Sequence, residues 1–224
     1  MMTIKLSERL MLSASMVPQG ASVADVGCDH GYLGIWLLQK EIASRVIASD
    51  LREMPLTAAK RNAEKYDVAD RISFRCAYGL SAIEPDEIDT AVCAGMGGDL
   101  IRMILEDAPW LRDGRYTLIL QPQSGAHELR KWLYDGGFAI EQEKAVREGH
   151  VYFAMKVRYT GEKTPYTPGS LFVTPQMRQT DCGFYIDRML QSIERTIKGL
   201  REASAPGDKP AFYEQAYREI LEMR

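Results

Sequence analysis

The feature that most limits the fold is an alternation of two patterns between residues 21 and 160. Short runs rich in β-branched residues alternate with segments whose apolar residues recur at helical spacing. Such alternation is typical of βαβ units, in which crossover helices join parallel strands. We predict strands at 23–26, 45–49, 72–76, 90–94, 116–120, 138–146 and 151–159, and helices at 32–41, 55–66, 98–107 and 126–134.

The last two predicted strands are separated only by residues 147–150. Because a crossover connection needs about a dozen residues or more, these strands should pair as an antiparallel hairpin. A parallel sheet that ends in a hairpin is the arrangement of class I methyltransferases, whereas most nicotinamide-binding domains lack the hairpin. We therefore predict an α/β fold with a Rossmann-like sheet of the class I methyltransferase type.

A change in composition after residue 160, rich in glycine and proline, marks a domain boundary. We predict a cofactor-binding domain at 1–160, including an N-terminal helix, and a small helical domain at 165–224. Apolar residues of this tail lie at heptad spacing on both sides of a turn at 205–208: Ile186, Leu190, Ile193, Ile197 and Leu200, then Tyr213, Ala216, Ile220 and Met223. This spacing predicts a coiled-coil-like helical hairpin. We interpret the apolar stripe of this hairpin primarily as packing between its two helices. The alternative interpretation is that the hairpin forms an arm that binds a large partner.

Composition limits the partners and the compartment. The 28 Lys and Arg against 31 Asp and Glu give a net charge of −3, which excludes a generally basic nucleic-acid coat but not a local basic patch. No apolar run approaches the roughly 20 residues of a membrane helix, and residues 1–9 read as a charged helix rather than a signal peptide. The four cysteines form no C-x-x-C pair, so we predict no metal site and a cytoplasmic protein.

The first predicted strand runs directly into a glycine-containing loop, residues 27–31, and then into a helix. Such a loop is where α/β folds bind nucleotides, because glycine permits close approach and the helix start presents free amides. A dinucleotide fingerprint would need a second glycine where Asp29 stands. A carboxylate there repels a pyrophosphate but attracts the sulfonium and ammonium groups of S-adenosylmethionine. Asp29 therefore favours S-adenosylmethionine over NAD.

Later strands end in residues that complete this pattern. Asp50 follows Gly27 at about the 20-residue spacing of a carboxylate that binds ribose hydroxyls. Residues 77–80 offer backbone amides to an adenine edge, and the Ala-Gly-Met-Gly-Gly segment at 94–98 ends the fourth strand. The N/D-P-P-Y motif of amino-group methylases is absent there, which is consistent with a ring nitrogen as acceptor. Each element alone has a purely structural alternative as a turn, helix cap or strand end; their order favours a cofactor site.

We predict cofactor contacts from twelve residues: Asp25, Gly27, Asp29, His30, Gly31, Asp50, Leu51, Ala77, Gly79, Ala94, Gly95 and Met96.

Four motifs together resemble the TrmK family, the bacterial tRNA (adenine-22-N1)-methyltransferases. They are residues 7–10, the D-x-G-x-D-H-x-Y-L segment at 25–33, the A-G-M-G-G segment at 94–98, and residues 118–123. The resemblance covers residues 4–159 and, more loosely, the tail. It implies methylation of N1 of adenosine 22 in the D-arm region of tRNA, with S-adenosylmethionine as donor and the helical hairpin assisting tRNA binding. The chain departs from the usual pattern at Cys28, Asp50, Tyr78 and Gln123, where Ser, Glu, Asn and Asn are common.

The implied acceptor needs no deprotonation, because the N1 lone pair lies in the ring plane, but the base must be unpaired or flipped out. Asp29 and His30 are candidate catalytic residues that shape the charge around the sulfonium and the incoming base, and Asp29 is placed to accept an N6 proton. The alternative for His30 is a structural hydrogen-bonding role.

Candidate RNA contacts are basic residues of three segments: Lys5 and Arg9, then Lys60, Arg61 and Lys65, then Arg188, Arg195, Lys198 and Arg201. Two other functions remain open on sequence grounds. One is methylation of a small molecule, with the tail as a lid or a dimer contact. The other is a non-enzymatic RNA- or protein-binding module with a retained fold. The sequence leaves the oligomeric state open, a monomer included.

Overall fold

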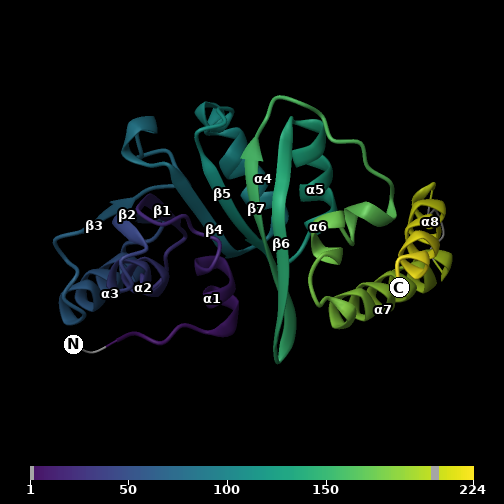
Figure 1. Ribbon diagram of the computed structural model, residues 1–224, viewed down its shortest axis with the longest axis horizontal. Helices are drawn as coiled ribbons and strands as arrows, with labels where there is room; N and C mark the ends of the chain where they lie inside the picture. Colours follow the sequence, from purple (N-terminus) through teal and green to yellow (C-terminus); the bar gives the residue numbers. More distant parts are fainter. Residues whose placement is uncertain (1–2, 203–206) are drawn as a thin grey trace.

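The computed structural model describes residues 3–202 and 207–224 and is built on one mixed sheet (Figure 1). The sheet has seven strands in the order β3-β2-β1-β4-β5-β7-β6. Strands β1 to β5 pair in parallel, and β7 pairs antiparallel with both β5 and β6. The strands are β1 (Ala21–Val26), β2 (Ala43–Asp50), β3 (Ile72–Cys76), β4 (Thr90–Met96), β5 (Thr117–Pro122), β6 (Phe138–Glu148) and β7 (His150–Tyr159). The predicted Rossmann-like sheet with a terminal hairpin is confirmed.

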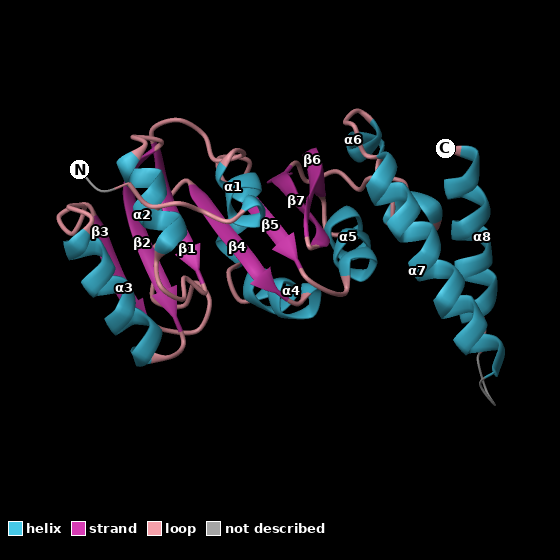
Figure 2. Ribbon diagram, turned by 90° about the horizontal axis from the view of Figure 1, so that it is seen from below, coloured by secondary structure: helices cyan, strands magenta, loops and turns pink. Residues whose placement is uncertain are grey.

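Helices cover both faces of the sheet (Figure 2). One face packs on α1 (Glu8–Ala14), α2 (Tyr32–Gln39) and α3 (Glu53–Lys65), and the other on α4 (Gly98–Glu106) and α5 (Ala126–Asp135). Neighbouring residues of a strand enter opposite cores, as Val23 and Ala24 of β1 do. Burial on both faces explains why these strands read as continuous apolar runs.

The beginning of the chain differs from the prediction of a helix over residues 1–9. Helix α1 starts only at Glu8, where the Ser7 hydroxyl caps it by accepting a hydrogen bond from the Leu10 N–H at 3.3 Å. Ile4 and Leu6 are both buried against the α2 side of the sheet, and this alternating burial requires an extended backbone. Residues 1 and 2 lie outside the described part of the chain.

The hairpin between β6 and β7 is tighter than the predicted four-residue connection. Glu148 pairs with His150, and only Gly149 stands between the strands, with a left-handed φ of +67°. The Glu148 carboxylate accepts hydrogen bonds from the backbone N–H groups of Glu8 and Arg9, each at 3.2 Å. The hairpin therefore caps the start of α1 and holds this helix against the face of the sheet.

The tail folds as helices around a continuation of the same core. After residues 160–168 come η3 (Gly169–Leu171), α6 (Pro175–Arg178), α7 (Gly183–Glu202) and α8 (Lys209–Glu222). The last two run antiparallel side by side (Figure 2). Ile193 of α7 and Ile220 of α8 are buried in the cluster that also contains the α5 side of the sheet. Within the predicted turn at 205–208, residues 205 and 206 lie outside the described residues.

A buried ion pair joins this tail to the sheet. The Arg130 side chain on α5 donates to Glu143 Oε1 of β6 at 3.1 and 2.6 Å, and both side chains are at most 1% exposed. Arg130 also donates to the Leu171 carbonyl at 2.8 Å and to the Tyr185 hydroxyl at 3.0 Å, while the Thr174 hydroxyl donates to the second Glu143 oxygen. Burial is the largest single influence on the pKa of Arg130 and lowers it, but the charges of Glu143 and Tyr185 and the hydrogen bonds to both side chains together raise that pKa above its usual value. The guanidinium is therefore a fixed charge at the junction.

No helix of the described residues is both long and apolar enough to cross a membrane.

Candidate active site

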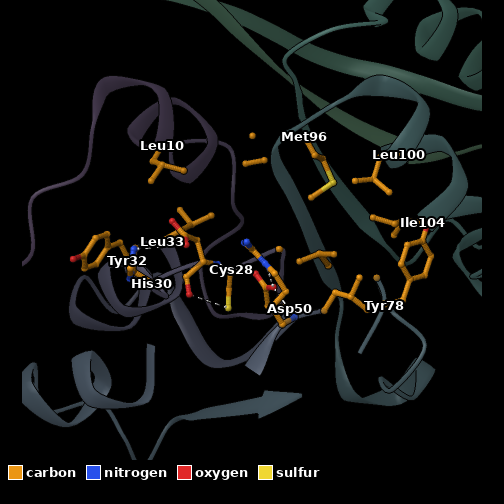
Figure 3. A pocket seen from close by; sticks show the side chains of 18 of the residues that line it. Leu10, Cys28, His30, Tyr32, Leu33, Asp50, Tyr78, Met96, Leu100 and Ile104 are labelled. Carbon is orange, nitrogen blue, oxygen red and sulfur yellow. Dashed lines mark hydrogen bonds and ion pairs between the residues drawn. The ribbon is translucent and has the colours of Figure 1, made fainter. Parts of the chain in front are cut away.

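A cavity of about 570 Å³ opens at the carboxyl ends of β1, β2 and β4 (Figure 3). We call it the active-site cavity. It lies where the strand order reverses between β1 and β4, which is the position at which open α/β sheets bind ligands. Its volume is within the range of small-molecule sites. Ten of the twelve predicted residues line it: Gly27, Asp29, His30, Asp50, Leu51, Ala77, Gly79, Ala94, Gly95 and Met96.

The other two predicted contacts, Asp25 and Gly31, are not among the lining residues. The Asp25 carboxylate is buried beneath α2, where it accepts a hydrogen bond from the Gly34 N–H at 3.2 Å. Gly31 caps α2 with a φ of +73°, and a Cβ there would lie 3.0 Å from the Ala59 Cβ. Both residues fix the helix that follows the loop, and in this structure neither faces the cavity.

Burial raises the pKa of Asp25 to about 7, and the nearby negative charge of Asp50 also raises it. The hydrogen bond from the Gly34 N–H acts in the opposite direction and lowers the pKa. A carboxyl whose pKa is raised by folding stabilises the fold at low pH and loses that contribution as the pH rises toward 7. We expect the wild-type free energy of unfolding to fall by about 3 kcal/mol between pH 5 and pH 8 from this group alone. Asp25→Asn keeps the acceptor for Gly34 and should lose this pH dependence. Urea unfolding of both proteins at the two pH values measures it, and parallel pH profiles would contradict it.

The loop after β1 presents Asp29 in an unusual backbone conformation. Its φ is +50°, in the left-handed region that a glycine would adopt with less strain. The Asp29 N–H donates to Asp50 Oδ2 at 3.4 Å, and the Gly27 and Cys28 N–H groups donate to the Ser49 carbonyl at 2.8 and 3.0 Å. Asp29 thus keeps the path of a glycine loop while adding a charge, and its side chain is 67% exposed.

His30 lies beside this carboxylate. Its Nε2 is 3.7 Å from Asp29 Oδ1, and its side chain is 49% exposed. The ring also stands 5.6 Å from the Tyr32 ring, while the His30 carbonyl accepts a hydrogen bond from Asn62 at 3.0 Å. The two predicted catalytic residues therefore lie side by side, and both line the cavity, where Figure 3 labels His30.

The glycine run after β4 permits a close approach of two backbone segments. The Gly98 N–H donates to the Ser124 carbonyl at 2.8 Å, and a Cβ on Gly98 would stand 2.9 Å from the Gly125 carbonyl carbon. Helix α4 can therefore begin directly against the loop between β5 and α5. This packing explains the last glycine of the motif without any ligand, and it brings Gln123 of that loop to the cavity.

Sequence reasoning missed Arg9 and Gln123 as cavity residues. A Cβ on Gly95 would lie 3.3 Å from Arg9 Nη1 and 3.7 Å from Gln123 Nε2, so both side chains border this glycine. The Arg9 guanidinium lies 5.6 Å from the centre of the Tyr152 ring and, among the described residues, forms no ion pair. The signals available were the motifs at 7–10 and 118–123, although Arg9 was predicted to contact RNA rather than to line the cavity.

The remaining lining residues are mostly apolar, and the sequence analysis did not predict them as cofactor contacts, although several lie within its motifs. They are Leu10, Val26, Cys28, Tyr32, Leu33, Arg52, Tyr78, Leu100 and Ile104.

The predicted RNA-contacting cations do not gather into one patch. Helix α3, which carries Lys60, and helix α7 lie at opposite ends of the molecule (Figure 1). Lys60 lies over the Phe74 ring at 5.9 Å, and Arg201 is paired with Glu214 at 2.7 Å. Any RNA surface therefore depends on a subset of these residues.

Comparison with known proteins shows the family of this chain. Residues 6–155 match a family model described as a methyltransferase domain. The tRNA (adenine(22)-N(1))-methyltransferase of Bacillus subtilis is 32% identical over 210 residues, which cover 92% of this chain and 88% of that protein. The chain belongs to the tRNA (adenine(22)-N(1))-methyltransferase family.

Solved structures agree with membership of the tRNA (adenine(22)-N(1))-methyltransferase family. Sp1610 of Streptococcus pneumoniae, solved in complex with S-adenosyl-L-methionine, has a TM-score of 0.83 at 30% identity and covers 98% of this chain and 99% of its own. The Bacillus subtilis m1A22 tRNA methyltransferase TrmK has a TM-score of 0.79 at 30% identity, with 98% and 95% covered. The likeness therefore extends through the helical tail, and the family resemblance of the sequence is confirmed.

Proposed function

We propose that this chain transfers the methyl group of S-adenosylmethionine to N1 of adenosine 22 in tRNA. The observation that carries the proposal is the likeness to a tRNA (adenine(22)-N(1))-methyltransferase over 92% of the chain. The residues that line the active-site cavity all lie within residues 6–155, which match the methyltransferase-domain model. S-adenosylmethionine is the cofactor, which the complex of Sp1610 supports.

The lining residues fit this cofactor. Asp50 ends β2 with a side chain only 9% exposed, placed to accept hydrogen bonds from ribose hydroxyls. A Cβ on Gly27 would lie 3.0 Å from the Met96 side chain, so glycine keeps open the room between β1 and β4. Asp29 offers a negative charge for an ammonium group, and no pyrophosphate would be favoured next to it.

Catalysis of this reaction depends mainly on the positioning of the adenine N1 against the methyl group. When bound, S-adenosylmethionine supplies an electrophilic methyl group on a sulfonium sulfur. The adenine N1 lone pair forms the new N–C bond as the C–S bond breaks, and no proton must leave N1 first. Near-attack placement can supply roughly 7–11 kcal/mol of such a barrier. The residues around Gly95 border the place where the acceptor would meet the cofactor, and the base must leave its pair to enter.

Asp29 is proposed to act through its charge, favouring the cation that forms on the adenine and accepting an N6 proton. Asp29→Asn keeps the shape and removes the charge. Because the side chain is 67% exposed, its attraction for the ammonium group is screened, and Asp29→Asn should weaken the binding of S-adenosylhomocysteine by less than about 10-fold. At saturating S-adenosylmethionine we expect a loss of about 10- to 100-fold in the single-turnover rate. Rapid-quench methylation of tRNA measures it. Full single-turnover activity in this variant would remove the catalytic role.

The function itself is tested by transfer of a labelled methyl group to unmodified tRNA, followed by nucleoside mapping. We expect 1-methyladenosine at position 22. Good cofactor binding without incorporation into tRNA would instead favour a small-molecule substrate. Absence of both would favour a non-enzymatic binding module.

We further propose that residues 165–224 form the tRNA-binding arm of this enzyme and that the enzyme works in the cytoplasm, where tRNA is modified. Support for the arm comes from the exposed basic side chains of α7, such as Arg188 and Arg195.

A further inference from the structure

A second cavity, of about 460 Å³, lies between the sheet and helix α7. Its walls are the loop between β5 and α5, the start of β7, and the face of α7 that carries Arg188 and Ser192. Gln123 lines both this second cavity and the active-site cavity, so the two adjoin at that residue. A ligand in the second cavity would therefore lie next to whatever is methylated.

The deep polar groups of the second cavity are occupied by structural contacts. Arg130 and Tyr185 belong to the buried network around Glu143. The His127 ring lies between Glu128, 2.9 Å from Nδ1, and the Tyr213 hydroxyl, 3.3 Å from Nε2. The polar groups of Arg130, Tyr185 and His127 are therefore already hydrogen-bonded or ion-paired within the protein, and they form the floor of the second cavity.

The outer polar groups are free. Within residues 3–202 and 207–224, the side chains of Gln123, Ser124, His150, Arg188 and Ser192 make no hydrogen bond or ion pair. They come from the β5–α5 loop, the hairpin and α7, yet face one space. No Asp or Glu is among the lining residues, so the permanent charge of the rim is the Arg188 cation. Such a rim suits an anion that also accepts hydrogen bonds.

An aromatic face stands at the same rim. Tyr152 is partly exposed, with the His150 ring edge-on at 6.3 Å and the Arg9 guanidinium over it at 5.6 Å. Exposed aromatic rings that lie beside free cations are the usual platform for an unstacked nucleic-acid base. The combination therefore matches a nucleotide, with a flat base and a phosphate, better than a phosphate alone.

We propose that the second cavity binds the nucleotide adjacent to the methylated adenosine, with its base against Tyr152 and its phosphate at Arg188. The inference rests on the proposed function and adds a subsite to it. When a base leaves its pair to be methylated, the stacking of the adjacent bases is also disturbed. A binding site for one adjacent nucleotide would stabilise this unpaired conformation of the strand.

The test is steady-state methylation of tRNA by four variants. Arg188→Ala removes the cation, and Ser192→Trp fills the cavity. Thr196→Trp is the matched control for Ser192→Trp, because Thr196 lies beyond the cavity one turn further along the same helix. Lys40→Ala is the control for the loss of one positive charge, because Lys40 is an exposed cation at the end of α2 and does not line the cavity. We expect the first two variants to lower kcat/KM for tRNA at least about 10-fold through KM, and the controls to change it less than about 3-fold. Arg188→Lys should recover part of the loss.

Affinity for S-adenosylhomocysteine, measured by calorimetry, should be the same in all variants and shows that each is folded. If the wild type methylates tRNA and the cavity variants match their controls, the subsite is overturned while the proposed function stands. A loss confined to kcat with an unchanged KM would also overturn it. If the wild type does not methylate tRNA, the proposed function fails, and the subsite fails with it.

Discussion

The variant Gly27→Val is expected to bind S-adenosylhomocysteine more than about 100-fold more weakly than the wild type, which corresponds to about 3 kcal/mol. Gly27 has a φ of +70°, which a β-branched residue adopts only with strong strain. A Cβ there would also stand 3.0 Å from the Met96 side chain, inside the space between β1 and β4 that the cofactor needs. Isothermal titration calorimetry measures the affinity.

Gly20 provides the matched control, because it precedes the same strand and has a φ of +79°, and a Cβ at this position would have nothing within 4 Å. Gly20→Val therefore carries the same kind of backbone strain without filling the cavity. It should lower thermal stability while leaving the affinity for S-adenosylhomocysteine within about 3-fold of the wild type. Equal loss of affinity in both variants would mean that strain, and not occupation of the cavity, explains the effect of Gly27.

The positions of the strands along the chain and the placement of the cavity could be predicted because they depend on local signals. β-branched runs, the loop at 27–31 and the segment at 94–98 each report a strand end, and parallel strands bring such ends to one edge. Asp29 shows how local this region is, since it occupies a glycine position of the loop pattern and has a backbone conformation that glycine adopts with less strain. Its φ is +50°, and its N–H donates a hydrogen bond to Asp50.

Side-chain direction and distant pairing could not be predicted in this way. Asp25 ends the same strand as the loop, but whether its carboxylate faces the cavity or α2 depends on how the helix packs. Arg9 reaches the cavity because Glu148, 139 residues away, caps its helix. Arg130 and Glu143 look like surface charges in a helix and a strand, and only the folded tail buries them.

That buried pair is the basis of the largest expected effect on stability. Arg130→Met keeps most of the side-chain volume but leaves Glu143 as an unpaired charge with no exposed surface. Removing one partner of such a pair typically costs about 3–5 kcal/mol. We expect a loss of this size in the free energy of unfolding, measured by urea titration. Because Arg130 also holds the Leu171 carbonyl and the Tyr185 hydroxyl, the tail should become sensitive to protease before the sheet does.

A substitution of the neighbouring residue, Lys131, tests whether burial or ion pairing itself explains the expected loss of stability in Arg130→Met. Lys131 pairs with Asp135 at the same 2.6 Å as the Arg130–Glu143 contact, but the two side chains are 54% and 47% exposed. Lys131→Met should therefore cost less than about 1 kcal/mol, because solvent screens the exposed pair. The double variant Arg130→Met, Glu143→Leu should regain much of the loss, since no buried charge is left. If Lys131→Met costs as much as Arg130→Met, burial of the charge is not what makes this junction matter.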